Sequence, residues 1–148
     1  MTKLEIIPLE GIPEIRPGDD LVEIVGQIDT IQSGDILVVT QKIISKAENQ
    51  MIEIDPNDPL SHKPLVERES VRILRRRGDL IISQTKHGFV CANAGIDLSN
   101  VERGQAALLP DDSDRSARRL RDGLAGRFQL EVGLSLIHIS EPTRLATI

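Results

Sequence analysis

Aromatic residues are nearly absent from this chain. Its 148 residues include two Phe and no Trp or Tyr. A surface on which single-stranded bases stack needs aromatic side chains, so that kind of nucleic-acid site is excluded. Lys and Arg number 18 against 23 Asp and Glu, which gives a net charge of −5. We therefore expect no overall attraction to nucleic acid or to an anionic membrane.

Cysteine and long apolar runs are also scarce. Cys91 is the single cysteine, so no disulfide can form within the chain, and a reducing compartment is indicated. The longest aliphatic run, Ile36–Val39, is far too short to cross a bilayer, and the amino terminus lacks a long apolar stretch. These features predict a cytoplasmic protein. A hydrophobic fraction of 39% over this length predicts one globular domain.

The common catalytic and phosphate-binding motifs do not occur. Neither Gly-x-x-x-x-Gly-Lys-Ser/Thr nor Gly-x-Gly-x-x-Gly is present, and there is no Gly-x-Ser-x-Gly. Any nucleotide site must therefore be of another kind. The three histidines share no zinc-type spacing with Cys91. Cys91 fits either a nucleophile assisted by His87 or a small buried strand residue.

Apolar runs and turn formers predict strands and helices at uneven spacing. Strands are expected at 4–9, 36–39, 80–83, 89–91 and 105–110, the second of them buried on both faces. Helices are expected to begin after Asp19 or Asp20, after Thr40 and at 112–114, and to span 65–77, with an exposed loop at 49–63. Such a mixture favours an α+β (mixed α/β) fold with mixed sheets and flanking helices.

The strand at 89–91 leads into a loop rich in oxygen donors. Asp97, Ser99 and Asn100 lie within four positions after Gly95. A carboxylate beside amide and hydroxyl oxygens suits a hard cation such as Mg²⁺, which needs few protein oxygens when phosphates complete its shell. The alternative is an Asx-type turn, in which Asp97 and Asn100 accept hydrogen bonds from nearby backbone amides.

The helix expected after Thr40 carries Lys42 and Lys46 on one side, because residues four apart share a helix face. Two neighbouring cations repel each other unless an anion lies between them, and a strand-to-helix junction can bind phosphate. The alternative is an ordinary solvated face. The residues alone thus indicate a metal-assisted phosphate site without establishing one.

Four segments resemble the ligases that add L-glutamate to the precursor of the deazaflavin coenzyme F420. They are 8–21, 34–48, 87–101 and 107–117, which contain Gly-Ile-Pro-Glu-Ile, Thr-Gln-Lys-Ile-Ile-Ser-Lys-Ala-Glu and Cys-Ala-Asn-Ala-Gly-Ile-Asp-Leu-Ser-Asn. The likeness covers about residues 4 to 133. It implies the amino-terminal half of that family's fold, which works as a homodimer.

This resemblance implies a GTP-dependent ligase that requires Mg²⁺ or Mn²⁺ and responds to K⁺. Its partners would be GTP, L-glutamate and the deazaflavin precursor, whose phospholactyl carboxylate is activated as an acyl phosphate. By the same resemblance Asp97 would hold the metal; no catalytic residue is assigned. The nucleotide would be lined by Ile12, Pro13, Glu14, Ile15, Gln41, Lys42, Lys46 and Asn100. The family pattern is variable where Gln41 and Lys42 fall.

The likeness stops after Gly133. The family would continue into a Thr-Asp-Thr segment with further metal ligands, whereas residues 134–148 look like translated adapter sequence. We therefore expect residues 1–133 to be a truncated ligase domain and residues 134–148 to be a non-family tail. Leu134, Leu136 and Ile139 could still form a strand. A non-catalytic module that binds nucleotide or deazaflavin, and an inactive fragment, are the alternatives to a ligase.

Overall fold

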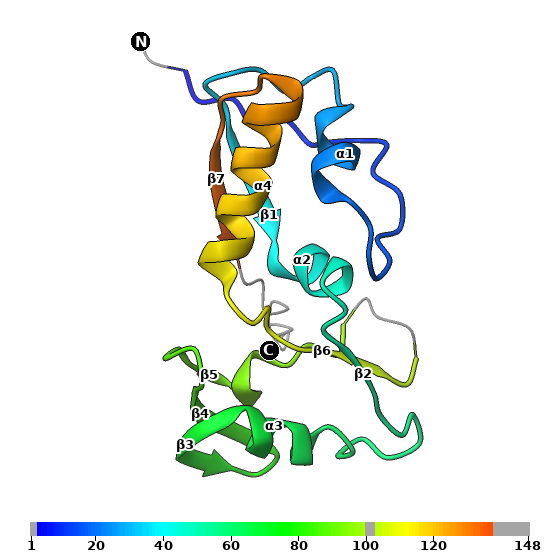
Figure 1. Cartoon of the computed structure of the whole chain (residues 1–148). Helices are drawn as coiled ribbons and strands as arrows, with labels where there is room; N and C mark the ends of the chain where they lie inside the picture. The colour runs from blue at the N-terminus through cyan, green and yellow to red at the C-terminus, as the bar shows by residue number, and fades with distance from the viewer. Residues whose placement is uncertain (1–2, 100–102, 138–148) are drawn as a thin grey trace, which may run out of the picture.

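The computed structural model describes residues 3–99 and 103–137. Asn100 and Ile139 lie outside these described residues. The upper part of the molecule in Figure 1 contains four elements that pack around one core. They are the helices α1 (Leu21–Gly26) and α4 (Ser113–Phe128) and the strands β1 (Ile36–Thr40) and β7 (Gly133–Ile137). Helix α2 (Gln41–Ala47) follows β1 directly and lies between the upper and lower parts.

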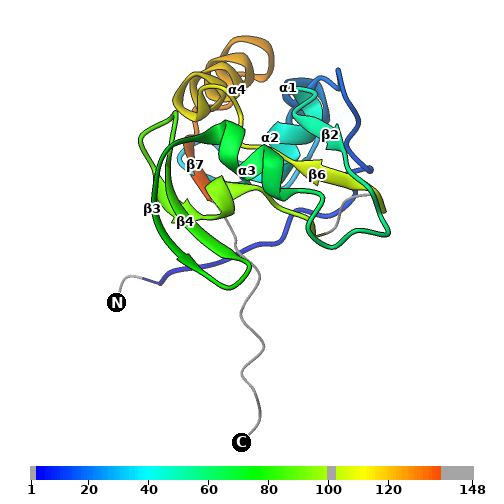
Figure 2. The ribbon, with the colours of Figure 1, turned by 90° about the horizontal axis from the view of Figure 1, so that it is seen from below.

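The lower part contains two small sheets and a helix. An antiparallel sheet of three strands consists of β3 (Ser70–Arg77), β4 (Leu80–Thr85) and β5 (Val90–Ala92). The second sheet pairs β2 (Met51–Glu53) with β6 (Gln105–Ala107) in antiparallel fashion. Seen from below, helix α3 (Lys63–Glu69) lies between the two sheets (Figure 2). A 3-10 turn, η1 (Asn93–Gly95), follows β5.

These elements confirm the expected mixed α+β fold. Two of the predicted helix starts are correct in detail. Asp20 caps α1 by accepting hydrogen bonds from the amides of Val22 and Glu23, and Asp112 caps α4 by accepting one from Arg115. Thr40 stands at the start of α2 with an extended backbone, but its side chain makes no capping bond.

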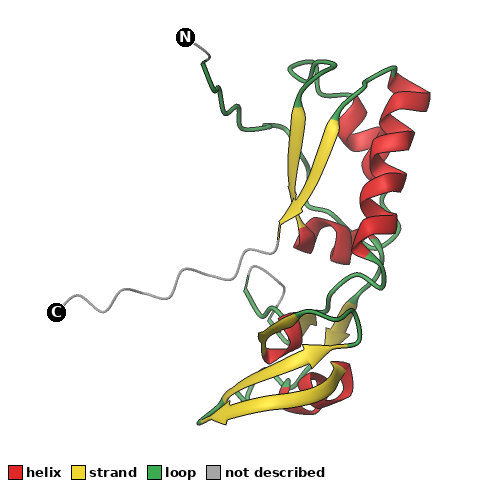
Figure 3. Ribbon diagram, turned by 90° about the vertical axis from the view of Figure 1, so that its left-hand side faces the viewer, coloured by secondary structure: helices red, strands yellow, loops and turns green. Residues whose placement is uncertain are grey.

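The prediction that the first long strand is buried on both faces was wrong. β1 pairs in parallel with β7, and the helices lie on one side of the two strands (Figure 3). Leu37 points into the core, whereas Ile36 and Val38 are 71% and 61% exposed. Within the described residues no helix or strand covers that outer face. Leu134 and Leu136 do form the expected strand, and they pack against the upper core.

Three other assignments need correction. Residues 4–9 form no strand, and their apolar side chains Leu4 and Ile6 are both 86% exposed. The predicted helix at 65–77 ends at Glu69, and the chain continues as β3, because Val71 and Ile73 favour a strand that pairs with β4. The loop expected at 49–63 contains β2.

No helix of the described chain has the length and apolar character needed to span a bilayer.

The two helices of the upper part approach each other closely at glycines. A Cβ atom at Gly26 would lie 2.3 Å from the Phe128 ring, and one at Gly123 would lie 2.5 Å from Val22. Gly126, one turn later on α4, has nothing within 4 Å of such an atom. Gly123 therefore allows the contact between α1 and α4, whereas Gly126 has no packing role.

This contrast predicts opposite effects of adding one methyl group to α4. Gly123→Ala should lower the free energy of unfolding by about 1–3 kcal/mol, since the new Cβ overpacks against Val22. Gly126→Ala should raise it by roughly 0.5–1 kcal/mol, since alanine favours a helix over glycine. Denaturant unfolding measures both, and Val22→Ala should rescue Gly123→Ala. Equal effects of the two variants would contradict this packing.

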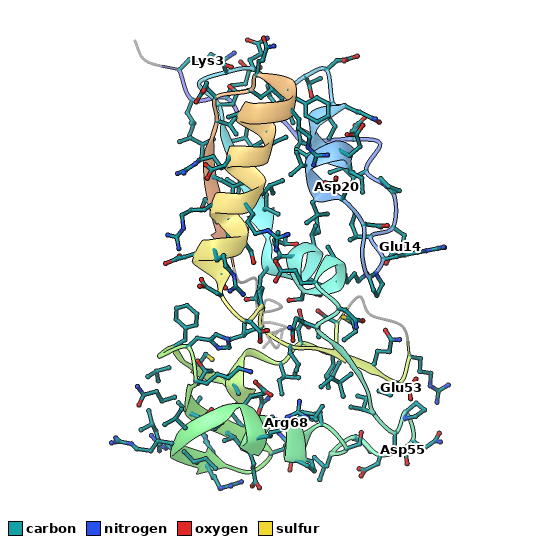
Figure 4. The ribbon with its side chains drawn as sticks, in the orientation of Figure 1. Lys3, Glu14, Asp20, Glu53, Asp55 and Arg68 are labelled. Carbon is teal, nitrogen blue, oxygen red and sulfur yellow. The ribbon has the colours of Figure 1, made fainter. Side chains whose placement is uncertain are left out.

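An ion pair also joins the two helices. Arg127 at the end of α4 donates two hydrogen bonds to the Asp20 carboxylate at the start of α1, of 2.7 and 2.8 Å (Asp20 is labelled in Figure 4). Hydrogen bonds from Arg127 lower the pKa of Asp20 from 3.8 to about 2, with help from the amides of α1. The carboxylate is thus more acidic in the folded than in the unfolded chain.

The lowered pKa of Asp20 determines how the stability of the fold changes with pH. The stabilisation by Asp20 should be fully present above its unfolded pKa of 3.8, and it should be lost as the pH falls towards about 2. The stability difference between the native chain and Asp20→Asn should therefore shrink between pH 5 and pH 2.5. Thermal unfolding across this range measures it, with Asp122→Asn as a control because Asp122 pairs with its own neighbour Arg121. A pH-independent difference would contradict the assignment.

Candidate functional site

The backbone of Asp97 is fixed to β6, in the two-stranded sheet of the lower part. Its amide donates to the carbonyl of Ala107 over 2.9 Å, and its carbonyl accepts from the Ala107 amide over 2.8 Å. These two bonds form an isolated antiparallel bridge beside β6. Helix α2 is attached to the same segment, because Ser45 Oγ donates to the carbonyl of Leu108 over 2.6 Å. The strand β6 and the residue after it, Leu108, thus fix the position of Asp97 relative to α2.

Lys42 on α2 contacts the loop that carries Asp97. Its Nζ atom lies 2.9 Å from Asp97 Oδ2, 2.6 Å from the Ser99 carbonyl oxygen and 2.8 Å from Ser99 Oγ. The side chains of Lys42 and Asp97 are only 19% and 21% exposed. The bonds to Ser99 join residues 57 positions apart in sequence, and the same contact reaches Asp97. It brings together Lys42 and Asp97 from the predicted set.

Asp97 also makes the turn that was the alternative interpretation. Its Oδ1 atom accepts hydrogen bonds from the Ser99 amide over 2.7 Å and from Ser99 Oγ over 2.6 Å. Burial raises the pKa of Asp97, but hydrogen bonds from Lys42 and Ser99 outweigh burial and lower the pKa below its usual range. The carboxylate is therefore held ionised at neutral pH.

Lys46 stands one turn further along α2 and forms an ion pair with Glu14. Glu14 belongs to the segment 12–15, and it lies beside α2 in Figure 4. The Gly18 amide donates to the Ala47 carbonyl over 2.9 Å, which fixes this segment to the end of α2. Within the segment Ile15 is buried, Ile12 is half-buried and Pro13 is exposed. The pKa of Glu14 is lowered by its hydrogen bond from Lys46.

The lysine pair therefore has a structural explanation as well as a functional one. Each lysine contacts a carboxylate of the same chain, so the repulsion between them is offset without any bound anion. Both ammonium groups still lie on one face of α2, next to the two loops that the sequence predicts to line a nucleotide. An entering anion can bind there if it displaces or joins these carboxylates.

Gln41, the first residue of α2, belongs to a neighbouring cavity of about 380 Å³. The cavity has mostly apolar walls from β5, α4 and β7. Its lining consists of Gln41, Phe89, Cys91, Gly95, Leu109, Ser113, Asp114, Ala117, Leu134, Leu136 and Ile137. Gln41 precedes Lys42 and Gly95 lies two residues before Asp97, so the cavity and the lysine and carboxylate cluster share these two segments of the chain.

Cys91 fits the structural reading better than the catalytic one. Burial raises the pKa of its thiol, which is opposite to the shift that activates a nucleophile. The His87 ring stacks on Phe89 with 6.3 Å between ring centroids. Among the described residues neither ring nitrogen of His87 has a hydrogen-bond partner, so His87 does not bond to Cys91.

A metal site made of protein side chains alone is absent from residues 3–99 and 103–137, because no three His, Cys, Asp or Glu side chains gather there. Asp97 is a single carboxylate with a hydroxyl beside it. This donor set fits Mg²⁺ or Mn²⁺ weakly by itself and best in company with phosphate oxygens, which is how Mg²⁺ is commonly held in nucleotide sites. The predicted nucleotide residue Asn100 lies outside the part that the structure describes.

Known proteins of one family resemble this chain. The family model for F420-0:Gamma-glutamyl ligase matches residues 11–140. The chain belongs to this family. It is 38% identical to the coenzyme F420:L-glutamate ligase of Methanopyrus kandleri, over 89% of this chain and 57% of the relative. It is also 38% identical to the enzymes of the same name from Methanothermobacter thermautotrophicus and Archaeoglobus fulgidus, over 79% and 80% of this chain. The chain spans about half the length of these relatives.

Asn93 was not among the predicted site residues of this ligase-family chain, yet it fixes the turn before Asp97. Asn93, Ala94 and Gly95 have φ values of 48°, 53° and 73°, so three successive residues are left-handed. Asn93 Oδ1 accepts hydrogen bonds of 3.2 Å from Lys63 Nζ and from the Ile81 amide. The one sequence signal was an Asn before Ala-Gly, because Asn tolerates this conformation.

This anchor predicts that Asn93→Gly is destabilising although glycine suits the backbone. The Ile81 amide would lose this acceptor, and Lys63 would keep only the Asp79 carbonyl, which should lower the free energy of unfolding by about 1–3 kcal/mol. Asn49 is the matched control, because it is exposed and also left-handed at φ 57°. Asn49→Gly should change stability by less than about 0.5 kcal/mol. Similar losses in both variants would show that the side-chain bonds of Asn93 have no role.

Proposed function

We propose that this chain supplies the nucleotide-binding part of a ligase that adds L-glutamate to the deazaflavin precursor of coenzyme F420. The observation that supports it is the joined arrangement of Lys42, Asp97 and Ser99 beside Lys46 and Glu14. It combines two cations on α2 with two ionised carboxylates. Family membership supplies the class of reaction.

The proposed reaction has two steps. The γ-phosphoryl group of GTP passes to the phospholactyl carboxylate, which gives an acyl phosphate and GDP. The amine of glutamate then attacks the acyl carbon, so that a C–N bond forms, the C–O bond to phosphate breaks, and the amine loses a proton. Phosphate leaves, and the product is an amide. Both steps handle highly charged groups, so cationic side chains must hold them in place.

Residues of this chain have separate roles in the proposal. Lys42 and Lys46 bind phosphate oxygens and offset their charge, while segment 12–15 contacts the nucleotide beside α2. Asp97 would hold Mg²⁺ or Mn²⁺ together with the phosphates, and the cation would offset the charge of the transferred group. The response to K⁺ and the homodimer of the whole protein belong to the same proposal, with no residue of this chain assigned to either.

The neighbouring cavity is our proposed place for the acceptor. The proposal rests on its walls from β5, η1 and α4, because Leu134, Leu136 and Ile137 belong to the segment expected to lie outside the family. Its apolar walls and its volume of about 380 Å³ suit a flat ring system, since binding pockets are usually apolar with a few polar groups. Gln41 and Gly95 in its lining belong to the same segments as Lys42 and Asp97, which supports an acceptor bound near the nucleotide. An acceptor held there could extend its carboxylate towards the nucleotide.

Titration with GTP and Mn²⁺ tests the nucleotide site. The native chain should bind GTP with Mn²⁺ saturably, and Asp97→Ala and Lys46→Ala should each weaken binding about tenfold or more, because a direct charge contact is lost. Glu131→Ala, a change at an exposed residue in the upper part, should have no effect. Unfolding curves control for loss of structure. Unchanged affinity in both site variants would refute the proposed site.

Adding the deazaflavin acceptor and glutamate distinguishes a ligase from a module that only binds nucleotide. GDP release that depends on both acceptor and glutamate supports the ligase. Saturable GTP binding without GDP release supports the non-catalytic module, which the half-length coverage of the relatives also allows. Ala117→Phe, which fills the cavity, should remove acceptor binding and leave GTP binding intact.

A further inference from the structure

The ammonium group of Lys42 has no hydrogen-bond donor to spare. A lysine ammonium carries three donors, and Nζ of Lys42 has three acceptors, Asp97 Oδ2, Ser99 O and Ser99 Oγ, at 2.6 to 2.9 Å. Three of the roughly four acceptor sites of Asp97 are also occupied, since Oδ1 accepts two bonds from Ser99 and Oδ2 contacts Lys42. A phosphate therefore cannot bind Lys42 until the contact opens, and a cation on the remaining site of Asp97 Oδ2 would lie against the Lys42 ammonium and be repelled.

Burial makes it costly to open this contact from one side only. The two side chains are 19% and 21% exposed, so a charge that loses its partner there is poorly compensated by water. A phosphate that takes Lys42 would leave Asp97 as an unpaired anion. A divalent cation that takes Asp97 would leave Lys42 as an unpaired cation. When both ligands bind, each freed charge gains a new partner.

We propose that Lys42 is the residue that couples cation binding to polyphosphate binding, and so selects nucleoside triphosphate in its metal complex over either component alone. This inference rests on the proposed nucleotide site. It gives the two lysines of that site, Lys42 and Lys46, different roles. The exchange involves no covalent step. Asp97 exchanges its partner, the Lys42 ammonium, for the divalent cation. Lys42 exchanges its partner, the Asp97 carboxylate, for a phosphate oxygen.

Lys46 provides the contrast within the same helix. Its partner Glu14 is 74% exposed, so that carboxylate can turn into water when a phosphate replaces it. Phosphate binding at Lys46 therefore leaves no buried unpaired charge. Lys46 should contribute affinity for the anion without making that affinity depend on the cation.

The test measures each ligand alone, so that association of GTP with Mn²⁺ in solution does not enter. Free Mn²⁺ is followed by its electron paramagnetic resonance signal, and metal-free GTP by calorimetry in EDTA. Lys42→Met should bind Mn²⁺ alone at least about fivefold more tightly than the native chain, because Asp97 is released, and metal-free GTP more weakly. Lys46→Met should weaken GTP similarly and change Mn²⁺ affinity by less than about twofold.

The reciprocal variant guards against a misfolded Lys42→Met. In Asp97→Asn the competing charge is gone, so metal-free GTP should bind at least as tightly as to the native chain, and added Mn²⁺ should no longer improve binding beyond its effect in solution. Equal Mn²⁺ affinities in the two lysine variants would overturn the coupling role while leaving the nucleotide site intact. Failure of the native chain to bind GTP with Mn²⁺ would overturn both proposals.

Discussion

The contact between Lys42 and Asp97 is the constraint on which the arrangement of the site depends. It joins the helix after β1 to the loop after β5, two segments that belong to different parts of the molecule. Both charges are largely withdrawn from water, so the structure must keep them paired or supply a replacement for each. The backbone bridge between Asp97 and Ala107 and the bond from Ser45 to Leu108 set the distance between them.

The second ion pair, between Lys46 and Glu14, costs less to open because its carboxylate is exposed. Glu14 reaches Lys46 from a loop that is anchored to α2 through Gly18 and Ala47. An exposed pair contributes little to stability, so this contact is readily exchanged. Two lysines that look equivalent in the sequence thus differ in what a ligand must displace. Burial of the partner carboxylate, which periodicity does not show, makes this difference.

The sequence predicts elements well where the signal is local. Asp20 and Asp112 precede apolar stripes with helical spacing, and both cap helices. The error at 65–77 arises where local and distant signals compete. Glu67 and Arg68 favour a helix, but Arg72 and Ile73 pair with a strand that begins at Leu80, and this pairing depends on a turn at Gly78. Exposure of Ile36 was equally unpredictable, since a continuous apolar run does not reveal how many faces are covered.

For the candidate site, the sequence identifies the residues better than their interactions. Asp97 was expected to form either a turn or a ligand group, yet its two carboxylate oxygens face different partners and allow both. What places that carboxylate is a left-handed turn at 93–95, anchored by Lys63 and the Ile81 amide from elements earlier in the chain. Ala94 has no intrinsic preference for that conformation, so tertiary contacts must stabilise it. A loop motif therefore specifies its function only together with the strand and helix that hold its backbone in this shape.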